Sequence, residues 1–184
     1  MEPNEVFGST ASGSIHMVVA RRGNIPEVQG MLSTASRRAA ALGYKQWWDP
    51  FPVEVIEHSV ARGETYLAVE KGSVLGTIAL SWDDPKFWGE RPPDAGYVHR
   101  LCTTADAARG LGVEMLTWAD ITAAKRDRDW LRLDTPASNL RLRAYYESLG
   151  FQLHDEVDVV LGGVDGETEI WRAALYERRT QDDG

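Results

Sequence analysis

Residues 108–120, ARGLGVEMLTWAD, give the strongest indication of how this chain folds. A strand-like run, AGYVHRLCTT (95–104), precedes them, and a second one, WLRLDT (130–135), follows. Gly110 and Gly112 lie directly before an apolar run with helical spacing. Strand, glycine turn, helix and strand in this order predict a βαβ unit. Glycine lets the backbone approach a ligand closely and a helix N-terminus favours anions, so we expect this turn to bind a pyrophosphate group.

Two short motifs extend this prediction. Residues 107–112 read AARGLG, and residues 146–151 read YESLGF, with Asn139 at the start of the helix that leads to the second motif. The pair resembles the two markers of the GNAT N-acetyltransferases, in which Gln/Arg-x-x-Gly-x-Gly/Ala is followed by Asn, a short helix and Tyr-Glu-x-x-Gly-Phe. Both glycines match, whereas Ala107 stands where the family has Gln or Arg. The resemblance covers the C-terminal half of the domain.

The resemblance implies a fold and a cosubstrate. GNAT proteins have a mixed α/β fold with a central, mostly antiparallel sheet of about seven strands, splayed where strands four and five run parallel, and helices on both faces. They transfer an acyl group from acetyl-CoA to an amine. Their fourth strand bulges, and its main chain pairs with the pantetheine arm. The resemblance therefore assigns acetyl-CoA binding to Leu101, Cys102, Thr103, Arg109, Gly110, Leu111, Gly112, Val113 and Asn139.

Periodicity predicts the domain limits and the remaining elements. We expect a disordered lead-in over 1–14, a GNAT domain over 15–177 and a frayed tail over 178–184. Residues 83–94, with three prolines and a glycine, are expected to form no regular element. The expected elements are strand 15–21, helix 25–42, helix 52–62, strands 65–70 and 73–82, strand 97–103, helix 110–126, strand 130–135, helix 139–149, and strands 151–161 and 167–176.

Composition excludes several classes of protein. The chain has 184 residues, a formal charge of −8 and a single cysteine, Cys102. Nucleic-acid binding is disfavoured because it needs clustered cations, and one cysteine excludes an intrachain disulfide. No apolar run reaches the roughly 20 residues of a membrane helix, and no signal segment is found, so the sequence predicts a cytoplasmic protein without membrane contact. A homodimer stays open.

Tyr146 is the expected general acid. The family motif places its proton donor at the tyrosine before Glu, and a phenol can protonate a leaving thiolate because their pKa values, about 10 and about 8.5, are close. Helical spacing puts Leu142, Tyr145 and Leu149 on one apolar face. We therefore expect Tyr145 to lie in the core and Tyr146 to point about 100° away from it.

Two residues are candidates for deprotonating the amine. Asp134 lies in LDTPASN (133–139), which is similar to the Leu-Glu-Val-Arg-x-Ser-Asn of ribosomal-protein N-terminal acetyltransferases, and it precedes Tyr146 by twelve residues, as the carboxylate base of those enzymes does. The alternative role of Asp134 is to cap the following turn. His99 has a pKa suited to proton transfer near neutral pH and lies on the strand expected to bind pantetheine. The alternative role of His99 is structural.

Aromatic residues outside the motifs are expected to bind the acceptor. Rings in a loop offer rigid apolar walls and cation–π faces for an amine, although the same rings also suit packing. We expect the loop 43–52 and the segment 83–94 to form two walls of the acceptor site. The residues assigned to that site are Trp47, Trp48, Trp82, Trp88 and Tyr97.

Together these assignments predict an acyl-CoA-dependent N-acetyltransferase that modifies a primary amine of a small molecule, a metabolite or an antibiotic, by direct attack in a ternary complex. The small-molecule acceptor follows from a resemblance to actinobacterial GNAT proteins. No metal is expected, and no covalent enzyme intermediate, because Cys102 fits better as an inert strand residue. Two alternatives stay open: acetylation of a protein N-terminus or lysine, and a non-catalytic acyl-CoA sensor.

Overall fold

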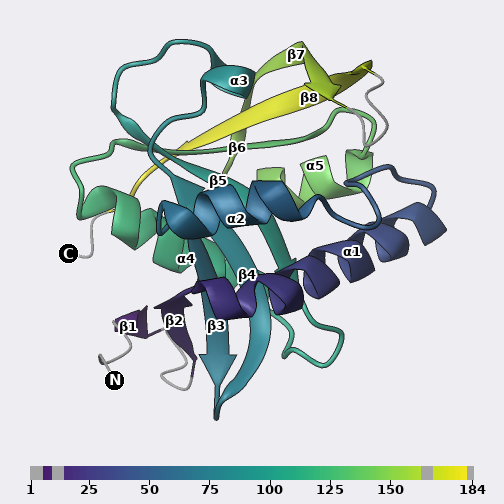
Figure 1. Ribbon diagram of the computed structural model, residues 1–184. Coiled ribbons are helices and arrows are strands. Elements are labelled where there is room, and N and C mark those ends of the chain that lie inside the picture. Colours follow the sequence, from purple (N-terminus) through teal and green to yellow (C-terminus); the bar gives the residue numbers. More distant parts are fainter. Residues whose placement is uncertain (1–5, 10–14, 163–167, 182–184) are drawn as a thin grey trace.

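The chain forms a mixed α/β fold (Figure 1). The computed structural model describes residues 6–9, 15–162 and 168–181, with side chains over 15–161 and 168–181. Its strands are β1 (Val6–Ser9), β2 (His16–Val19), β3 (Thr65–Glu70), β4 (Ser73–Ser81), β5 (Ala95–Thr103), β6 (Trp130–Pro136), β7 (Gln152–Gly162) and β8 (Thr168–Arg179). Its helices are α1 (Ile25–Ala41), which follows a 3₁₀ turn at Arg22–Asn24, α2 (Val53–Ala61), α3 (Pro85–Trp88), α4 (Leu111–Ala124) and α5 (Leu140–Ser148).

The strands form one sheet, which includes β1 as well as the seven strands from β2 to β8. Within the described residues the order is β1-β2-β3-β4-β5-β6-β8-β7. Neighbours are antiparallel except β5 and β6, which are parallel. Because a parallel pair cannot be joined by a hairpin, α4 carries the chain back from the end of β5 to the start of β6. The predicted βαβ unit is confirmed.

The helices cover both faces of the sheet, as predicted. Apolar residues of α1 and α2, such as Leu32 and Ile56, pack in one cluster with Leu67 of β3. Those of α4, with Met115 fully buried, pack in a second cluster on the other face, which Tyr146 of α5 joins. No helix that the structure describes is long and apolar enough to cross a membrane.

The structure differs from the sequence predictions in three short segments. Residues 6–9 form β1 within the expected lead-in, whose other residues, 1–5 and 10–14, lie outside the described ranges. Segment 83–94 contains α3, because the Asp84 side chain accepts a hydrogen bond from the Phe87 N–H (3.4 Å) and Pro85 suits a first helical turn. Strand β8 continues to Arg179, beyond the expected limit of the domain, because it pairs with β6 over that length. Residues 182–184 of the expected tail lie outside the described ranges.

Strand β5 leaves its parallel neighbour halfway along. It pairs with β4 as far as Thr103, but with β6 only from Ala95 to Val98. The sheet is therefore splayed between β5 and β6, as the resemblance implied. Beyond Val98 the edge of β5 that faces β6 has no strand partner among the described residues, so its main-chain groups are available to a ligand.

A bulge in β5 corrects the predicted alternation of its side chains. His99 lies opposite Ala79 and Cys102 opposite Thr77, so two residues of β5 face one of β4. The extra residue moves Leu101 to the α4 face and Cys102 to the face of α1 and α2, where each joins an apolar cluster. The predicted grouping of Leu101 with His99, and of Cys102 with Val98, is wrong for this reason.

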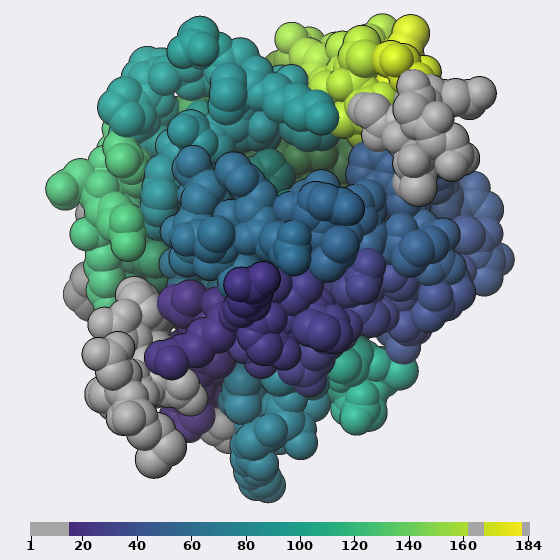
Figure 2. All heavy atoms as spheres, viewed as in Figure 1, coloured from purple at the N-terminus to yellow at the C-terminus, as the bar shows by residue number. Residues whose placement is uncertain are grey.

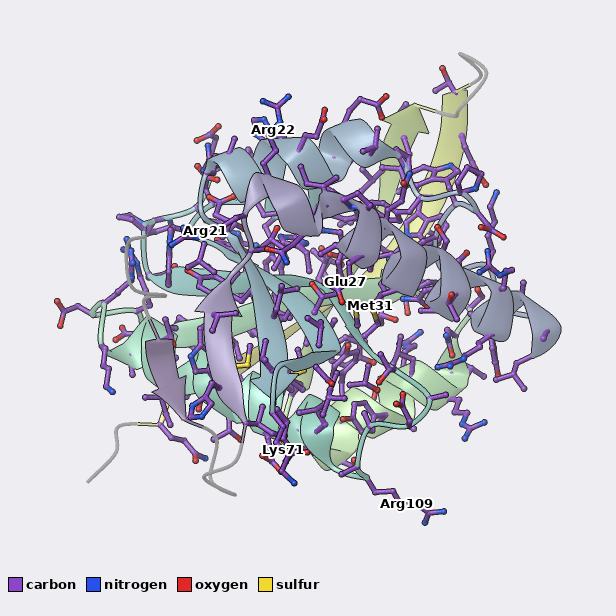
Figure 3. The ribbon with its side chains drawn as sticks, turned by 60° about the horizontal axis from the view of Figure 1, so that its bottom comes forward. Arg21, Arg22, Glu27, Met31, Lys71 and Arg109 are labelled. Atoms are coloured by element: carbon purple, nitrogen blue, oxygen red, sulfur yellow. The ribbon has the colours of Figure 1, made fainter. Side chains whose placement is uncertain are left out.

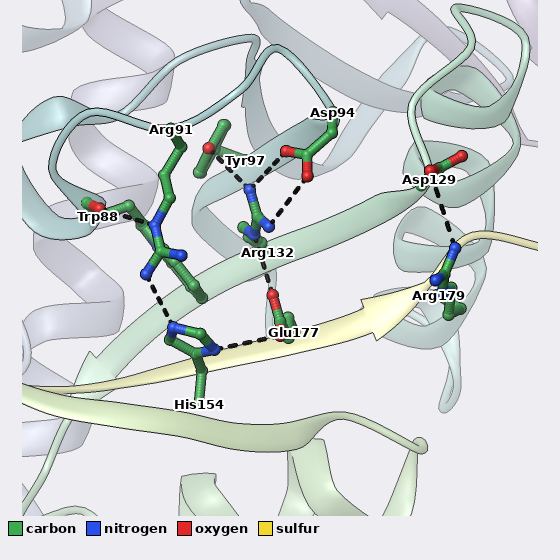
Figure 4. A network of polar contacts seen from close by, with 9 residues as sticks. All are labelled: Trp88, Arg91, Asp94, Tyr97, Asp129, Arg132, His154, Glu177 and Arg179. Carbon is green, nitrogen blue, oxygen red and sulfur yellow. Dashed lines mark hydrogen bonds and ion pairs between the residues drawn. The ribbon is translucent and has the colours of Figure 1, made fainter.

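A buried arginine connects the start of β5 to β6 and β8 (Figure 4). Arg132, 5% exposed at its side chain, donates from Nη1 to Asp94 (2.8 Å) and from Nε to Glu177 (3.0 Å). Nη1 also donates to the Tyr97 hydroxyl (3.1 Å), and the guanidinium lies 5.1 Å from the ring centre of Trp88 in α3. Arg132 thereby fixes α3 against the sheet.

Replacing Arg132 with methionine is expected to lower the free energy of unfolding by about 3 kcal/mol, because two half-buried carboxylates lose their buried cation. Thermal and urea unfolding would measure the change. The control is Asp129→Asn, which removes an ion pair with Arg179 of 3.8 Å whose side chains are 68% and 69% exposed. That variant should change stability by less than about 0.5 kcal/mol. Equal effects of the two variants would contradict a stabilising role for the buried network.

Candidate active site

A cavity of about 880 Å³ opens where β5 and β6 separate. Its walls come from the loop 43–52, α2, α3, the bulged part of β5, β6, the start of α5 and β8. Figure 2 shows these segments meeting on one face, where the surface is recessed between the teal segment 83–94, the blue region around α2 and the yellow-green hairpin of β7 and β8. Among the lining residues are Trp47, Trp48, Phe51, Asp84, Phe87, His99, Arg100, Leu101, Cys102, Asp134, Asn139, Leu142, Tyr146 and Trp171.

Tyr146 of α5 packs against the sheet, and its environment reverses one prediction. Tyr146 is 7% exposed, whereas Tyr145, expected in the core, is 37% exposed. Residues three and four positions after Leu142 both lie on its side of the helix. The core contains the one four positions on, Tyr146, rather than Tyr145. Tyr146 nevertheless lines the cavity, and its hydroxyl makes no hydrogen bond with the residues that the structure describes. Burial, with smaller effects of Tyr145 and Asp134, raises the pKa of Tyr146, so its hydroxyl stays protonated at neutral pH.

The rest of the YESLGF motif supports α5. The Tyr176 hydroxyl of β8 donates to Glu147 (2.6 Å) and accepts from Arg143 Nε (3.0 Å), so two residues of α5 are tied to the sheet. Gly150, with φ of 84°, ends the helix as predicted, and Phe151 is buried against the ring of Tyr146 (5.8 Å between centres). The motif thus holds Tyr146 in place.

His99 lies between two carboxylates. Its Nδ1 is 3.5 Å from Asp134 Oδ1 in β6, and its Nε2 is 3.8 Å from Asp84 Oδ2, just before α3. The structure therefore brings together both residues predicted to deprotonate the amine, and it adds Asp84, which the sequence analysis missed. Ligand atoms of the three residues lie within 4.8 Å of one another and could hold a cation. Since the two ring nitrogens face different carboxylates, the arrangement better suits a chain of proton exchange through His99.

Asp84 has the least favourable environment for a charge among the three groups. Its side chain is 8% exposed, and Oδ2 has no hydrogen-bond partner among the described residues. Burial raises the pKa of Asp84 to about 6, against the opposing effect of His99. A carboxyl group kept in such a place destabilises the fold when it ionises, and groups of this kind concentrate at functional sites.

The turn before α4 offers free main-chain donors to an anion. The N–H groups of Arg109, Gly110 and Gly112 have no hydrogen-bond acceptor among the described residues, and Gly110 has φ of 95°, which disfavours any other residue. A Cβ at Gly110 would meet no atom within 4 Å, so the space in front of the turn is open. Together with the free edge of β5, these groups fit the pyrophosphate and pantetheine parts of coenzyme A.

The other predicted cosubstrate residues differ in environment. Arg109 is exposed and projects from the turn, at the end of the molecule where Lys71 also lies (Figure 3). Leu111 is buried in the core. Asn139 lines the cavity and caps α5, as predicted, by accepting from the Leu142 N–H (3.1 Å). Burial raises the pKa of the Cys102 thiol to about 12, so the thiol is not a nucleophile at neutral pH.

Only part of the predicted acceptor site lines the cavity. Trp47 and Trp48 do so, at the loop 43–52. Trp82, Trp88 and Tyr97 are not among its lining residues. Trp82 lies on the α4 face under the guanidinium of Arg126 (4.4 Å), while Trp88 and Tyr97 pack against each other (6.1 Å between ring centres) around Arg132.

Several cavity residues were not found from the sequence. The α3 turn directs Phe87, rather than its neighbour Trp88, into the cavity. Asp84 carried the pattern of a helix cap, Asp-Pro before an aromatic pair, which could have been noticed. Arg100 faces the cavity because of the β5 bulge, and no local pattern indicates the position of that bulge.

Comparison with known proteins decides the family. The sequence model of the family described as "Acetyltransferase (GNAT) family" matches residues 31–151. The chain belongs to the GNAT family of acetyltransferases. It is an acyl-CoA-dependent N-acetyltransferase, with acetyl-CoA as its cosubstrate. No curated protein sequence matches the chain at a significant level.

Solved structures of other GNAT proteins share the fold. A GNAT acetyltransferase from Listeria monocytogenes is 21% identical, with a TM-score of 0.71 over 94% of this chain and 98% of its own. A ribosomal-protein-alanine N-acetyltransferase from Brucella melitensis is 16% identical, with a TM-score of 0.64 over 89% of this chain and 98% of its own. An N-acetylglutamate synthase from Neisseria gonorrhoeae, solved with coenzyme A and N-acetyl-glutamate, is 16% identical, with a TM-score of 0.61 over 91% of this chain and 35% of its own. The names of the last two indicate different acceptors, so the fold does not decide the acceptor of this chain.

The raised pKa of Asp84 predicts a pH-dependent effect of Asp84→Asn. The folded pKa of about 6 exceeds the unfolded value of 3.8, so ionisation destabilises the fold as the pH rises through this window. The asparagine variant avoids that loss and should be more stable than the parent at pH 7, by about 2 to 3 kcal/mol, and equally stable near pH 4. Urea unfolding at both pH values measures this. The matched control is Asp83→Asn, at a side chain 72% exposed, which should show no such pH dependence; a loss of stability in Asp84→Asn at pH 7 would contradict the argument.

Proposed function

We propose that this GNAT protein acetylates the primary amine of a small molecule by direct attack within a ternary complex. One observation supports the proposal most strongly: one cavity contains Tyr146, whose hydroxyl has no partner among the described residues, and His99, which lies between Asp134 and Asp84. A proton donor and proton acceptors are what acyl transfer from a thioester to an amine requires. When bound, acetyl-CoA supplies the activated acetyl group.

The residues have separate tasks in this proposal. His99 and Asp134 act as a pair that takes the proton of the ammonium group, so that the amine nitrogen can form its bond to the acetyl carbon as the carbon–sulfur bond breaks. Asp84 stabilises the imidazolium that results. Tyr146 gives its proton to the departing sulfur, and the second proton that the nitrogen loses as the amide forms returns to the Tyr146 oxygen. Burial raises the pKa of Tyr146 above that of a free thiol, so proton donation requires the sulfur anion to be buried beside it, where desolvation disfavours the thiolate as well.

The cavity supports a small acceptor. Its volume of about 880 Å³ lies within the range of small-molecule sites, roughly 300 to 1,000 Å³. Aromatic residues from three segments line it, namely Trp47 and Phe51 from the loop 43–52, Phe87 from α3 and Trp171 from β8. These apolar rings suit the side chain of a small acceptor. The decisive experiment is a thiol-release assay with acetyl-CoA against small amines and short peptides.

Tyr146→Phe tests the proton donor. Turnover is expected to fall by about 10²- to 10⁴-fold, because the sulfur would leave unprotonated, while the affinity for acetyl-CoA measured by calorimetry stays within about twofold. The control is Tyr44→Phe, at a tyrosine that does not line the cavity, which should retain activity. Unchanged turnover in Tyr146→Phe would mean that another group protonates the sulfur.

Gly112→Asp tests the phosphate turn. A carboxylate beside the free N–H groups should repel the pyrophosphate and weaken coenzyme A binding at least about tenfold, with less effect at high salt. A Cβ at this position would meet only the Tyr145 hydroxyl, at 3.4 Å, so the fold should tolerate the change. Gly30→Asp adds the same charge on α1, where a Cβ would have nothing within 4 Å, and serves as control. Equal affinities for coenzyme A would exclude the turn as the phosphate site.

A further inference from the structure

The bulge in β5 places two consecutive side chains in the same cavity. His99 lies opposite Ala79 and Cys102 opposite Thr77, so Arg100 and Leu101 together face one residue of β4. Arg100 has φ of 52°, in the left-handed region that non-glycine residues rarely adopt. Residues held in this region concentrate at functional sites. As a result both His99 and Arg100 line the cavity, whereas a regular strand would direct one to each face.

The Arg100 guanidinium has no partner. It makes no hydrogen bond or ion pair with the residues that the structure describes, although it is half-buried. The carboxylates whose charges act on it are Glu64 and Asp134. Glu64 already accepts a hydrogen bond from Arg62 Nε (2.8 Å), and Asp134 faces His99 (3.5 Å). The donors of Arg100 are therefore free within the cavity.

This arginine keeps its charge at neutral pH. Burial lowers the pKa of Arg100 to about 10, against the opposing effects of Glu64 and Asp134. A cation that has lost part of its hydration without gaining a partner destabilises the protein, and a bound anion would relieve that cost. The planar guanidinium matches a carboxylate best, through two parallel hydrogen bonds.

The proposed amine site lies next to this cation. His99, the preceding residue, stands between Asp84 and Asp134, whose negative charges suit an ammonium group. The cavity thus offers acidic groups and a guanidinium at adjacent positions, with aromatic walls around them. A ligand that satisfies both must carry an amine and an anionic group a short distance apart.

We infer that the acceptor is a free amino acid with an apolar side chain, whose carboxylate is bound by Arg100 and whose amine is bound between Asp84, His99 and Asp134. The apolar side chain packs against Trp47, Phe51 and Phe87. A peptide N-terminus has an amide in place of the carboxylate and would leave Arg100 unpaired. This inference rests on the proposed acetyl transfer and specifies its acceptor.

The test compares acceptors that differ only in the carboxylate. L-leucine and L-phenylalanine are each assayed with acetyl-CoA. Each is compared with its amide, leucinamide or phenylalaninamide, and with the amine that lacks the carboxylate, isopentylamine or phenethylamine. The amine pKa of the amide is lower than that of the amino acid, and that of the simple amine is higher. A preference for the amino acid over both therefore cannot result from the fraction of unprotonated amine. The parent should prefer the amino acid in kcat/KM by about 10- to 150-fold, as expected for hydrogen bonds to a charged group.

Arg100→Gln should remove that preference. KM for the amino acid should rise by the same about 10- to 150-fold, while KM for the amide and the amine changes less than about threefold. Arg100→Lys keeps the charge without the planar fork and should recover part of the preference. Arg22→Gln, at an exposed arginine outside the cavity, is the control and should behave as the parent. The parent comparison is independent of whether either Arg100 variant folds.

Two outcomes overturn the inference while leaving acetyl transfer intact. In the first, the parent has equal kcat/KM for the amino acid, the amide and the amine, and Arg100→Gln has the same selectivity. The other is that Arg100→Gln weakens acetyl-CoA binding in calorimetry, which would assign Arg100 to the cosubstrate.

A direct binding measurement separates the inference from the proposed function. Calorimetric titration of L-leucine into the protein saturated with coenzyme A should give binding that Arg100→Gln abolishes. If this holds but no amine is acetylated, the proposed function is wrong and the carboxylate site stands. If neither amino acid binds or reacts, the inference is wrong.

Discussion

The separation of β5 from β6 after Val98 is the constraint on which the rest of the site depends. Main-chain N–H and C=O groups at a sheet edge need partners, and here the loss of the neighbouring strand leaves a row of them facing a gap. The gap also admits side chains from both faces of the sheet. Tyr146 reaches it from the α5 side, and His99 with Asp84 from the side of α1 and α2. The proposed proton donor and proton acceptors therefore come together at the opening between the two strands.

Charged groups at that opening lower the stability of the fold, and interactions around them offset this loss. Asp84 has a buried side chain and a raised pKa, and Arg100 is half-buried with a lowered pKa, so both are less stable in their charged forms than in water. The buried network of Arg132 anchors α3 and the start of β5, which are the elements that bear Asp84 and lead into the bulge. Stability gained around Arg132 offsets strain that would otherwise loosen the site.

Local sequence patterns predicted most of the elements because those patterns record local physics. Helical spacing identified α1, α2, α4 and α5, and the glycines at positions 110 and 150 fixed a turn and a helix end by their backbone freedom. The same spacing gave the wrong choice between Tyr145 and Tyr146, since both are a helical step from Leu142. Alternation failed in β5 after His99, because one extra residue in a bulge inverts every later side chain. Aromatic residues near the site were assigned to the acceptor by type alone, and three of them do not line the cavity.

The sequence by itself determined the family, the βαβ unit with its glycine turn, and the identity of Tyr146, His99 and Asp134 as candidates, because each depends on residues close together in the chain. Only the tertiary structure decided that Asp84 and Arg100 share their cavity, and that Trp82, Trp88 and Tyr97 do not. Those outcomes depend on where a bulge falls, which way a four-residue helix turns and which side of a splayed sheet a side chain meets. They follow from packing between segments far apart in the chain, which a local pattern does not record.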